Sequence, residues 1–193
     1  MKNICFINVN TIKERSALHT NVDDKLILPE ILTAQDMYLL PALGTALYNR
    51  LQTGIESANL TADEIDLLDN FITNPLVYFT LSELPVGLSY QFYNKGLVRK
   101  TSDNTDQPNM QDLIDVASRY RTRAEFYTQR LIKHLKQVSS TTNKFQEYVN
   151  YGTGVDIVKP ERDAYQASIY LGDHYDYTTM TFEERYQGEN GIC

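Results

Sequence analysis

The segment Met110–Leu135, MQDLIDVASRYRTRAEFYTQRLIKHL, decides the fold class of this 193-residue chain. Its apolar residues recur every three or four positions, which is the spacing of one face of an α-helix. They are Met110, Leu113, Ala117, Tyr120, Ala124, Tyr127, Leu131 and Leu135. Such a helix would be roughly 40 Å long at ~1.5 Å per residue. Because a long helix is stabilised mainly by packing against other helices, the segment predicts a helical bundle.

Earlier segments predict the partner helices. Thr61 and Glu64 have the spacing of a capping box, which marks the first turn of a helix. Pro41 is expected to end one helix and start the next, and Pro75 to break or kink another. The segment Leu76–Asn94 is apolar on nearly every side. We therefore expect it to be a helix buried in the middle of the bundle.

The last part of the chain differs in character. Ser139–Asn143 reads as a polar linker, and the residues after Gly152 show little periodicity. Seven of the fourteen tyrosines lie in the last 46 residues, and tyrosine is favoured at interfaces because it combines a large contact area with a polar tip. The prediction is a mainly α fold: a helical bundle over 1–151 with a short strand or hairpin near 96–108, and an extended C-terminal interaction arm over 152–193.

The net charge of −7 is unevenly distributed along the chain. Between Leu51 and Pro85 there are six acidic residues and no Lys or Arg, whereas 109–137 carries six bases against three acids. From Ser139 to the last residue the net charge is −5. A protein that holds DNA through its phosphates usually has a surplus of basic residues. The overall acidity therefore disfavours stable nucleic-acid binding.

The sequence contains no recognisable catalytic constellation. His19, His134 and His174 do not have metalloprotease spacing, and Tyr151–Gly154 lacks the lysine of a phosphate-binding loop. Asp173–Asp176 brings two carboxylates and an imidazole together, which leaves a metal-dependent enzyme as a minor alternative. We expect no catalytic residue, no cofactor and no resident metal.

Cysteine content and hydropathy bear on the environment of the chain. Cys5 and Cys193 are near opposite ends of the sequence and are expected to be reduced thiols. No run of about 18 apolar residues is present, so no membrane span is expected. The first ten residues lack a small-residue cleavage site, so no signal peptide is expected.

Three groups of residues are similar to a known family. They are Ile31, Ala34-Gln35 and Leu40-Pro41-x-Leu43-Gly44-x-x-Leu47-Tyr48-x-x-Leu51; Asn94-Lys95-Gly96-Leu97-Val98; and Ala124-Glu125-x-Tyr127-x-x-Arg130-Leu131-x-x-His134-Leu135. They resemble, in this order, the opening helices, the short strand and the last long helix of tailed-bacteriophage head–tail connector (adaptor) proteins of the group found in Bacteroides and crAss-like phages. The resemblance extends from about Val22 to Tyr151, about two-thirds of the chain.

The resemblance implies a structural virion protein at the head–tail junction, assembled in the cytoplasm of the bacterial host. Such proteins form a ring beneath the portal, commonly of about twelve identical subunits. The implied partners are other copies of the chain, the portal protein, the next tail or ring protein and, transiently, the translocating DNA; no membrane is implied. Residues 1–151 would be the connector core, and the arm 152–193 would become ordered on assembly.

The candidate interface residues are basic side chains of the core and tyrosines of the arm. They are Arg99, Lys100, Arg119, Arg121, Arg123, Tyr165, Tyr170, Tyr175, Tyr177 and Tyr186. Two interpretations of the arginines in 119–123 stay open. The first is a solvated face with an Asp115–Arg119 ion pair. The second is a strip that contacts a neighbouring subunit or the portal, with the acid-only stretch Leu51–Pro85 as its counterpart within one chain or across the ring.

Two other classes of function are alternatives. A helical DNA-binding regulator would place Arg119–Arg123 on a recognition helix, although the net acidity and the apolar side of the same helix disfavour it. A small metal-dependent enzyme would use Asp173–Asp176. Salt-dependent binding to duplex DNA would identify the regulator, and the metal content of the purified protein would identify the enzyme.

Overall fold

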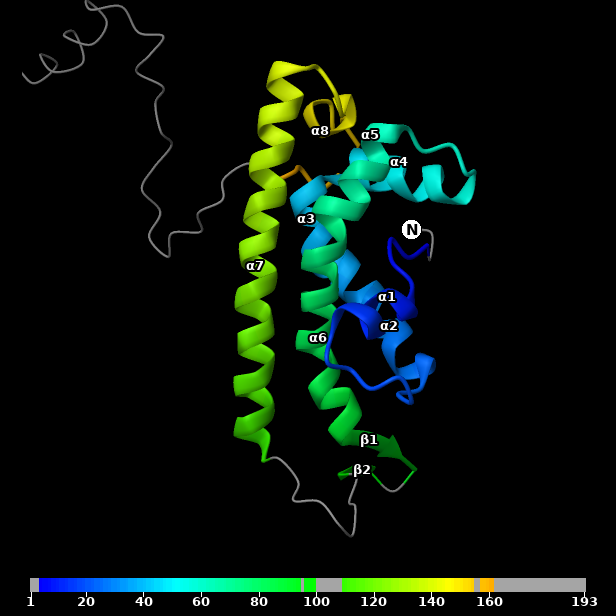
Figure 1. Ribbon diagram of the computed structural model, residues 1–193, viewed down its shortest axis with the longest axis vertical. Coiled ribbons are helices and arrows are strands. Elements are labelled where there is room, and N and C mark those ends of the chain that lie inside the picture. Colours follow the sequence, from blue (N-terminus) through cyan, green and yellow to red (C-terminus); the bar gives the residue numbers. More distant parts are fainter. Residues whose placement is uncertain (1–3, 95, 100–108, 155–156, 162–193) are drawn as a thin grey trace, which may run out of the picture.

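The computed structural model describes residues 4–94, 96–99, 109–154 and 157–161, and in these residues the chain is mainly helical (Figure 1). The elements are α1 Val9–Arg15, α2 Asp24–Ala34, η1 Gln35–Leu39, α3 Leu40–Leu43, α4 Thr45–Glu56, α5 Ala62–Leu67, η2 Leu68–Ile72, α6 Thr73–Ser89, β1 Tyr90–Tyr93, β2 Gly96–Arg99, α7 Met110–Thr141 and α8 Gln146–Val149. The two η elements are short π-helical segments. The predicted mainly α fold is confirmed, and α7 is the long helix expected over 110–135.

Helix α6 is the centre of the bundle. It packs against α7 on one side and against α2 on another (Figure 1). Nine of its 17 residues are buried. Two of its buried hydroxyls bond to backbone carbonyls: Thr80 Oγ1 donates to the Leu76 carbonyl at 2.8 Å, and Ser82 Oγ donates to the Phe79 carbonyl at 2.7 Å. These bonds satisfy the polar groups inside an apolar core, and the prediction of a buried central helix is confirmed.

Pro41 and Pro75 do not end a helix, because each follows a π-helical segment. Gln35–Leu39 ends two residues before Pro41, and Leu68–Ile72 ends three residues before Pro75. A proline ring clashes with the carbonyl four residues earlier and lacks an N–H, and a wider π-type turn accommodates both features. The predicted break at Pro41 is therefore wrong; the helix ends instead at Gly44, whose φ is 76°.

The antiparallel hairpin β1–β2 lies earlier than the sequence predicts. β1 begins at Tyr90, directly after α6, so the prediction of a helix up to Asn94 is wrong. The register pairs Tyr90 with Arg99. Aromatic residues favour extended structure where a partner strand is available, and here that preference overrides the helical pattern. Residues 100–108, the rest of the predicted hairpin, lie outside the described residues.

Helix α7 is longer than predicted at its C-terminal end. It continues to Thr141 and takes in most of the stretch that reads as a linker. The hydroxyls of Ser140 and Thr141 both donate to the Gln137 carbonyl, at 3.0 and 2.7 Å. Hydroxyl side chains bond to carbonyls of the preceding turn in this way. A Ser/Thr run can therefore continue a helix that its composition alone would end.

After α8 the chain returns to the bundle at the junction of α3 and α4. The Thr45 N–H donates to the Val158 carbonyl at 3.0 Å, and the Val158 N–H donates to Thr45 Oγ1 at 2.9 Å. The Glu161 N–H donates to the Pro41 carbonyl at 2.8 Å. Residues 157–161, the described end of the predicted arm, are thus bonded to the helical body. The division of the chain at residue 151 stays a prediction.

Gly44 is the residue that lets the returning chain approach this junction. Its φ of 76° lies in the left-handed region, which favours glycine. A Cβ added at Gly44 would lie 2.7 Å from Pro160 Cδ, well inside contact distance. Pro160 is buried there. The position therefore requires glycine for two independent reasons, its backbone conformation and the close contact with Pro160.

The stretch Asp24–Leu43, which comprises α2, η1 and α3, is long and apolar enough to cross a membrane by length and composition. The bundle core accounts for this apolar character, because Ile27, Ile31 and Leu39 are fully buried in it. A core helix of this kind passes the same test, so the stretch is only weak evidence for a membrane span.

Candidate interaction surfaces

One side of α7 is a row of exposed basic and apolar side chains, which we call the α7 outer face. Its members are Val116, Arg119, Arg123, Phe126, Arg130 and Lys133. They follow one another in steps of three and four residues, so they lie on one side of the helix. Four are basic and none is acidic, while Val116 is 43% and Phe126 65% exposed. A helix side with this spacing suits a second segment of chain packed along it.

The three arginines predicted as interface residues are exposed, but they do not share one side of α7. Arg119 and Arg123 belong to the α7 outer face, and the Arg123 guanidinium carbon lies 5.9 Å from the centre of the Tyr120 ring of the same helix. Arg121 instead lines a groove between α7 and the helix formed by α2, η1 and α3. The arginine cluster is therefore divided between two surfaces.

The described contacts correct the predicted Asp115–Arg119 ion pair. Asp115 accepts a hydrogen bond from Gln111 Nε2 at 3.0 Å. The described i,i+4 ion pair of this helix joins Arg121 Nε to Glu125 Oε1 at 3.4 Å. Both of these side chains are more than half exposed, and exposed pairs of this kind contribute little to stability. Arg119 thus belongs to the exposed row without this ion pair.

The groove beside Arg121 has a volume of about 540 Å³. Buried Phe79 and exposed Met37 both line it. Tyr38 stacks on Phe79 with 4.1 Å between ring centres, and its hydroxyl donates to Glu83 Oε1 at 2.6 Å. The Arg121 guanidinium carbon lies 5.5 Å from the centre of the Tyr38 ring. One aromatic side chain therefore links α7 to η1 and to α6.

These contacts raise the pKa of Tyr38 to about 12. Burial is the main cause, the hydrogen bond and charge of Glu83 add to it, and the Arg121 charge opposes it. The Tyr38 hydroxyl is therefore protonated at neutral pH and acts as a hydrogen-bond donor. In this form it holds the Glu83 carboxylate of α6 beside η1.

Two acids of the acid-only stretch are paired within the chain. Glu64 Oε1 lies 2.8 Å from Arg50 Nε, and Asp63 Oδ1 lies 2.7 Å from Lys144 Nζ. Glu64 also completes the predicted capping box, because the Thr61 N–H donates to Glu64 Oε2 at 2.7 Å. The capping box is confirmed, and these two acids have partners outside the arginine cluster. A pairing of the other acids across a ring stays a prediction.

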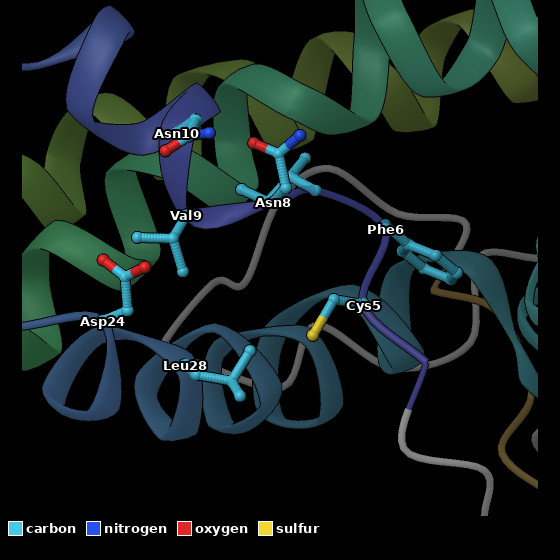
Figure 2. Close-up of a pocket in the computed structure, with 8 residues that line it drawn as sticks. Cys5, Phe6, Asn8, Val9, Asn10, Asp24 and Leu28 are labelled. Carbon is cyan, nitrogen blue, oxygen red and sulfur yellow. The ribbon is translucent and has the colours of Figure 1, made fainter.

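A hollow of about 580 Å³ lies between the N-terminal segment and α2. Figure 2 shows Cys5 on the N-terminal segment, and Asp24 and Leu28 on α2. Asp24 is paired with Lys13 at 2.7 Å. Burial, with a smaller effect of the Asp36 charge, raises the pKa of the Cys5 thiol. Because a thiol with a raised pKa is mostly protonated at neutral pH, Cys5 is a weak nucleophile there.

A buried polar network fixes the N-terminal segment to the bundle. Fully buried Gln35 accepts a hydrogen bond from the Phe6 N–H at 2.8 Å. Its amide donates to the Ile4 carbonyl and to the Tyr48 hydroxyl, both at 2.9 Å. The Tyr48 hydroxyl in turn donates to Asp36, and burial followed by this bond raises the pKa of Tyr48. These polar residues therefore have a structural role inside an apolar motif.

Several predicted residues cannot be placed among these surfaces. Arg99 lies in β2. Those outside the described residues are Lys100, Tyr165, Tyr170, Tyr175, Tyr177 and Tyr186. The candidate metal segment Asp173–Asp176 lies outside them as well. Within the described ranges, no three His, Cys, Asp or Glu side chains are grouped so that they could hold a metal ion.

The two described histidines have structural partners. His134 stacks on Phe71 with 3.8 Å between ring centres, and burial, assisted by the Arg130 charge and opposed by Asp66, lowers the pKa of His134. His19 accepts a hydrogen bond at Nδ1 from the Asn21 N–H at 3.1 Å. The first contact packs α7 against η2, and the second lies within a turn.

The arginine cluster alone does not single out four members of the α7 outer face: Val116, Phe126, Arg130 and Lys133. The signal for them is nevertheless present in the sequence. Arg119, Phe126 and Lys133 recur every seven residues, as do the other three members of the face. Such a recurrence places the residues on one side of a helix, so this second row complements the apolar row that predicts the helix.

The chain belongs to a family of unknown function (DUF6712), whose model matches residues 39–155. The matched region begins at the end of η1 and includes α6, the hairpin, α7 and α8. It therefore covers both the central helix and the α7 outer face. No curated protein and no solved structure matches the chain.

Proposed function

We propose that the chain is a structural subunit that assembles into a ring, and that this ring is a head–tail connector of a tailed bacteriophage. The ring would join the portal of the DNA-filled head to the next tail protein and surround the DNA channel. Its place would be the head–tail junction of the virion, after assembly in the host cytoplasm. The resemblance of Leu40–Leu51, Asn94–Val98 and Ala124–Leu135 to connector proteins supports the proposal.

The observation that carries the proposal is the α7 outer face. Phe126 exposes 65% of its surface within a row of four basic side chains. Exposed apolar surface costs about 25 cal/mol per Å² relative to burial, and contact with a partner would recover this free energy. Arginine and aromatic residues are enriched at protein interfaces. The face extends over roughly 26 Å at ~1.5 Å per residue, which is long enough for contact along a helix.

The arrangement of the bundle also suits a ring. A closed ring of identical subunits uses a heterologous contact, in which two different surfaces of the subunit meet. Helix α7 lies along one side of α6, and α1 and α2 lie on the other side (Figure 1). Different helices thus form the two sides of the subunit. The net charge of −7 would favour passage of DNA through a channel without tight binding.

Imaging of the purified full-length chain, alone and with the portal protein encoded by the same genome, tests this proposal. We expect a ring at the tail-facing end of the portal. Phe126→Ser should prevent ring formation, whereas Ile65→Ser, which changes an exposed apolar residue of α5, should not. A wild-type chain that stays monomeric and does not bind the portal would exclude the connector function.

Nucleic-acid binding is the second candidate function, and the four exposed cations of the α7 outer face favour it. If these side chains contact phosphates, duplex binding should weaken steeply as salt increases, because each contact releases counterions. A filter or polarisation assay between about 50 and 200 mM salt measures this dependence. If the chain is a connector, we expect it to bind duplex DNA weakly, and Arg119→Glu and Arg123→Glu should change this binding little.

A further inference from the structure

We infer that the α7 outer face binds the C-terminal segment, residues 162–193, of a second copy of this chain. The inference rests on the proposed ring and names the two surfaces that would join one subunit to the next. It commits to a single occupant, because charge, apolar character and the position of residue 161 all favour that segment.

The two partners are complementary in charge and in apolar character. Between Val116 and Lys133 the α7 outer face carries four basic residues and no acid; Asp112, one step earlier in the same row, accepts a hydrogen bond from the Asn109 N–H. Residues 162–193 carry six acids and two bases. The same segment contains five tyrosines and further apolar residues such as Ile169 and Phe182. Opposite charges would orient the segment on the face. Its aromatic side chains would cover Phe126 and supply contact area.

The place where the described chain ends favours a second copy as the donor. The Glu161 N–H donates a hydrogen bond to the Pro41 carbonyl at 2.8 Å. Glu161 also lines the groove together with Arg121 and Ile132 of α7. At ~100° per residue, these two α7 side chains lie roughly 150° around the helix axis from the α7 outer face. The described chain therefore ends at Glu161 on one flank of α7, while the receiving face lies on the other. A head-to-tail contact needs this separation of donor and receiver.

Length does not limit this contact. The segment has 32 residues, and an extended chain of this size reaches about 100 Å. The receiving face needs only roughly 26 Å. The remaining length can cross from one subunit to the next.

Two full-length variants separate the donor from the receiver. The receiver variant carries Arg119→Glu and Arg123→Glu, and the donor variant carries Glu183→Lys and Glu184→Lys. Mass photometry over a concentration series measures self-association. Each variant alone should associate roughly tenfold or more weakly than the wild type, because like charges then oppose each other. An equimolar mixture should regain association, since each altered surface then meets a complementary one.

A matched control changes two exposed bases elsewhere. Arg15→Glu with Lys25→Glu alters the net charge by the same amount on α1 and α2, so it should leave self-association within about twofold of the wild type. Circular dichroism melts of all variants show whether the bundle is intact. An intact bundle together with recovery in the mixture supports the contact, because neither a folding defect nor a general charge effect predicts that recovery.

The outcomes separate this contact from the ring proposal. If the wild type forms rings and both variants form them equally well, the contact is wrong and the ring proposal stands. If the equimolar mixture of the two variants regains association but only open chains or dimers form, the contact stands and the ring proposal fails. If cross-linking joins Lys133 to the segment within a monomer, the segment occupies its own face and the inference of a second copy is overturned.

Discussion

Helices α6 and α7 pack against each other, yet solvent has very different access to them. Nine of the 17 residues of α6 are buried, against five of the 32 residues of α7. Packing inside the bundle explains why α6 is apolar all round. It explains less of the outer face of α7, where the members from Val116 to Lys133 are exposed and Arg130 alone reaches another element, with its guanidinium carbon 4.9 Å from the centre of the Phe71 ring of η2. The sequence of that face therefore points to a role outside the folding of the monomer.

The largest expected effect is in the core of α6. Leu76 is fully buried, so Leu76→Ala should lower the free energy of unfolding by about 2–5 kcal/mol through lost burial and an internal cavity. Leu131→Ala, on the buried side of α7, should cost a similar amount. Urea denaturation measures both. A loss below about 1 kcal/mol at Leu76 would show that α6 is not the packed centre.

A smaller effect is expected where the returning chain meets the α3–α4 junction. Gly44→Ala should destabilise the protein by about 1–3 kcal/mol, because φ is 76° and the new Cβ would lie 2.7 Å from Pro160. Gly87→Ala in α6 is the control: its Cβ would meet Glu30 at 3.7 Å, and alanine favours a helix by roughly 0.5–1 kcal/mol. Thermal melts that rank the two variants alike would refute this view of Gly44.

The buried flank of α7 should respond to pH through His134. Its pKa is lowered from 6.5, mainly by burial, so the unfolded chain binds this proton more readily than the folded one. Stability from this group is present above pH 6.5 and is lost as the pH falls below that value. His134→Phe should keep the stacking on Phe71 and reduce the acid-induced loss. Urea denaturation of the wild type and of His134→Phe at several pH values measures this effect. If stability depends on pH identically in the two proteins, His134 does not contribute to it.

The smallest effect on stability is expected at the centre of the α7 outer face. Phe126→Ser should change the free energy of unfolding by no more than about 0.5 kcal/mol, because the residue is 65% exposed. Urea denaturation beside Leu131→Ala measures the contrast between the two sides of one helix. A loss as large as that of Leu131→Ala would mean that Phe126 serves the fold of the monomer.

Local patterns in the sequence predict the helices whose stability depends on periodic burial and capping. The apolar row of Met110–Leu135, the capping box at Thr61 and the apolar segment after Pro75 each correspond to an observed element. The ends of elements are harder to predict. The π-helical turn before Pro41, and the hydroxyl bonds that extend α7 to Thr141, depend on backbone geometry that composition does not reveal.

Contacts between distant parts of the chain are also not predictable from such patterns. The bonds of Val158 with Thr45 join residues 113 positions apart, and no periodicity signals them. Of the candidate interface, the arginine cluster identifies Arg119 and Arg123 but also includes Arg121, which lies in the groove. The seven-residue recurrence through Phe126 separates the two surfaces, because it follows helix geometry instead of charge alone.

The most direct test of an assembly role for α7 is the mass of the full-length chain in solution. Sedimentation velocity over a range of concentrations should show, for the wild type, a closed species at a multiple of the 22.2 kDa subunit mass. Phe126→Ser should sediment as a folded monomer with an unchanged melting temperature. A wild type that stays at 22.2 kDa at every concentration, or a Phe126→Ser variant that assembles equally well, would contradict the account.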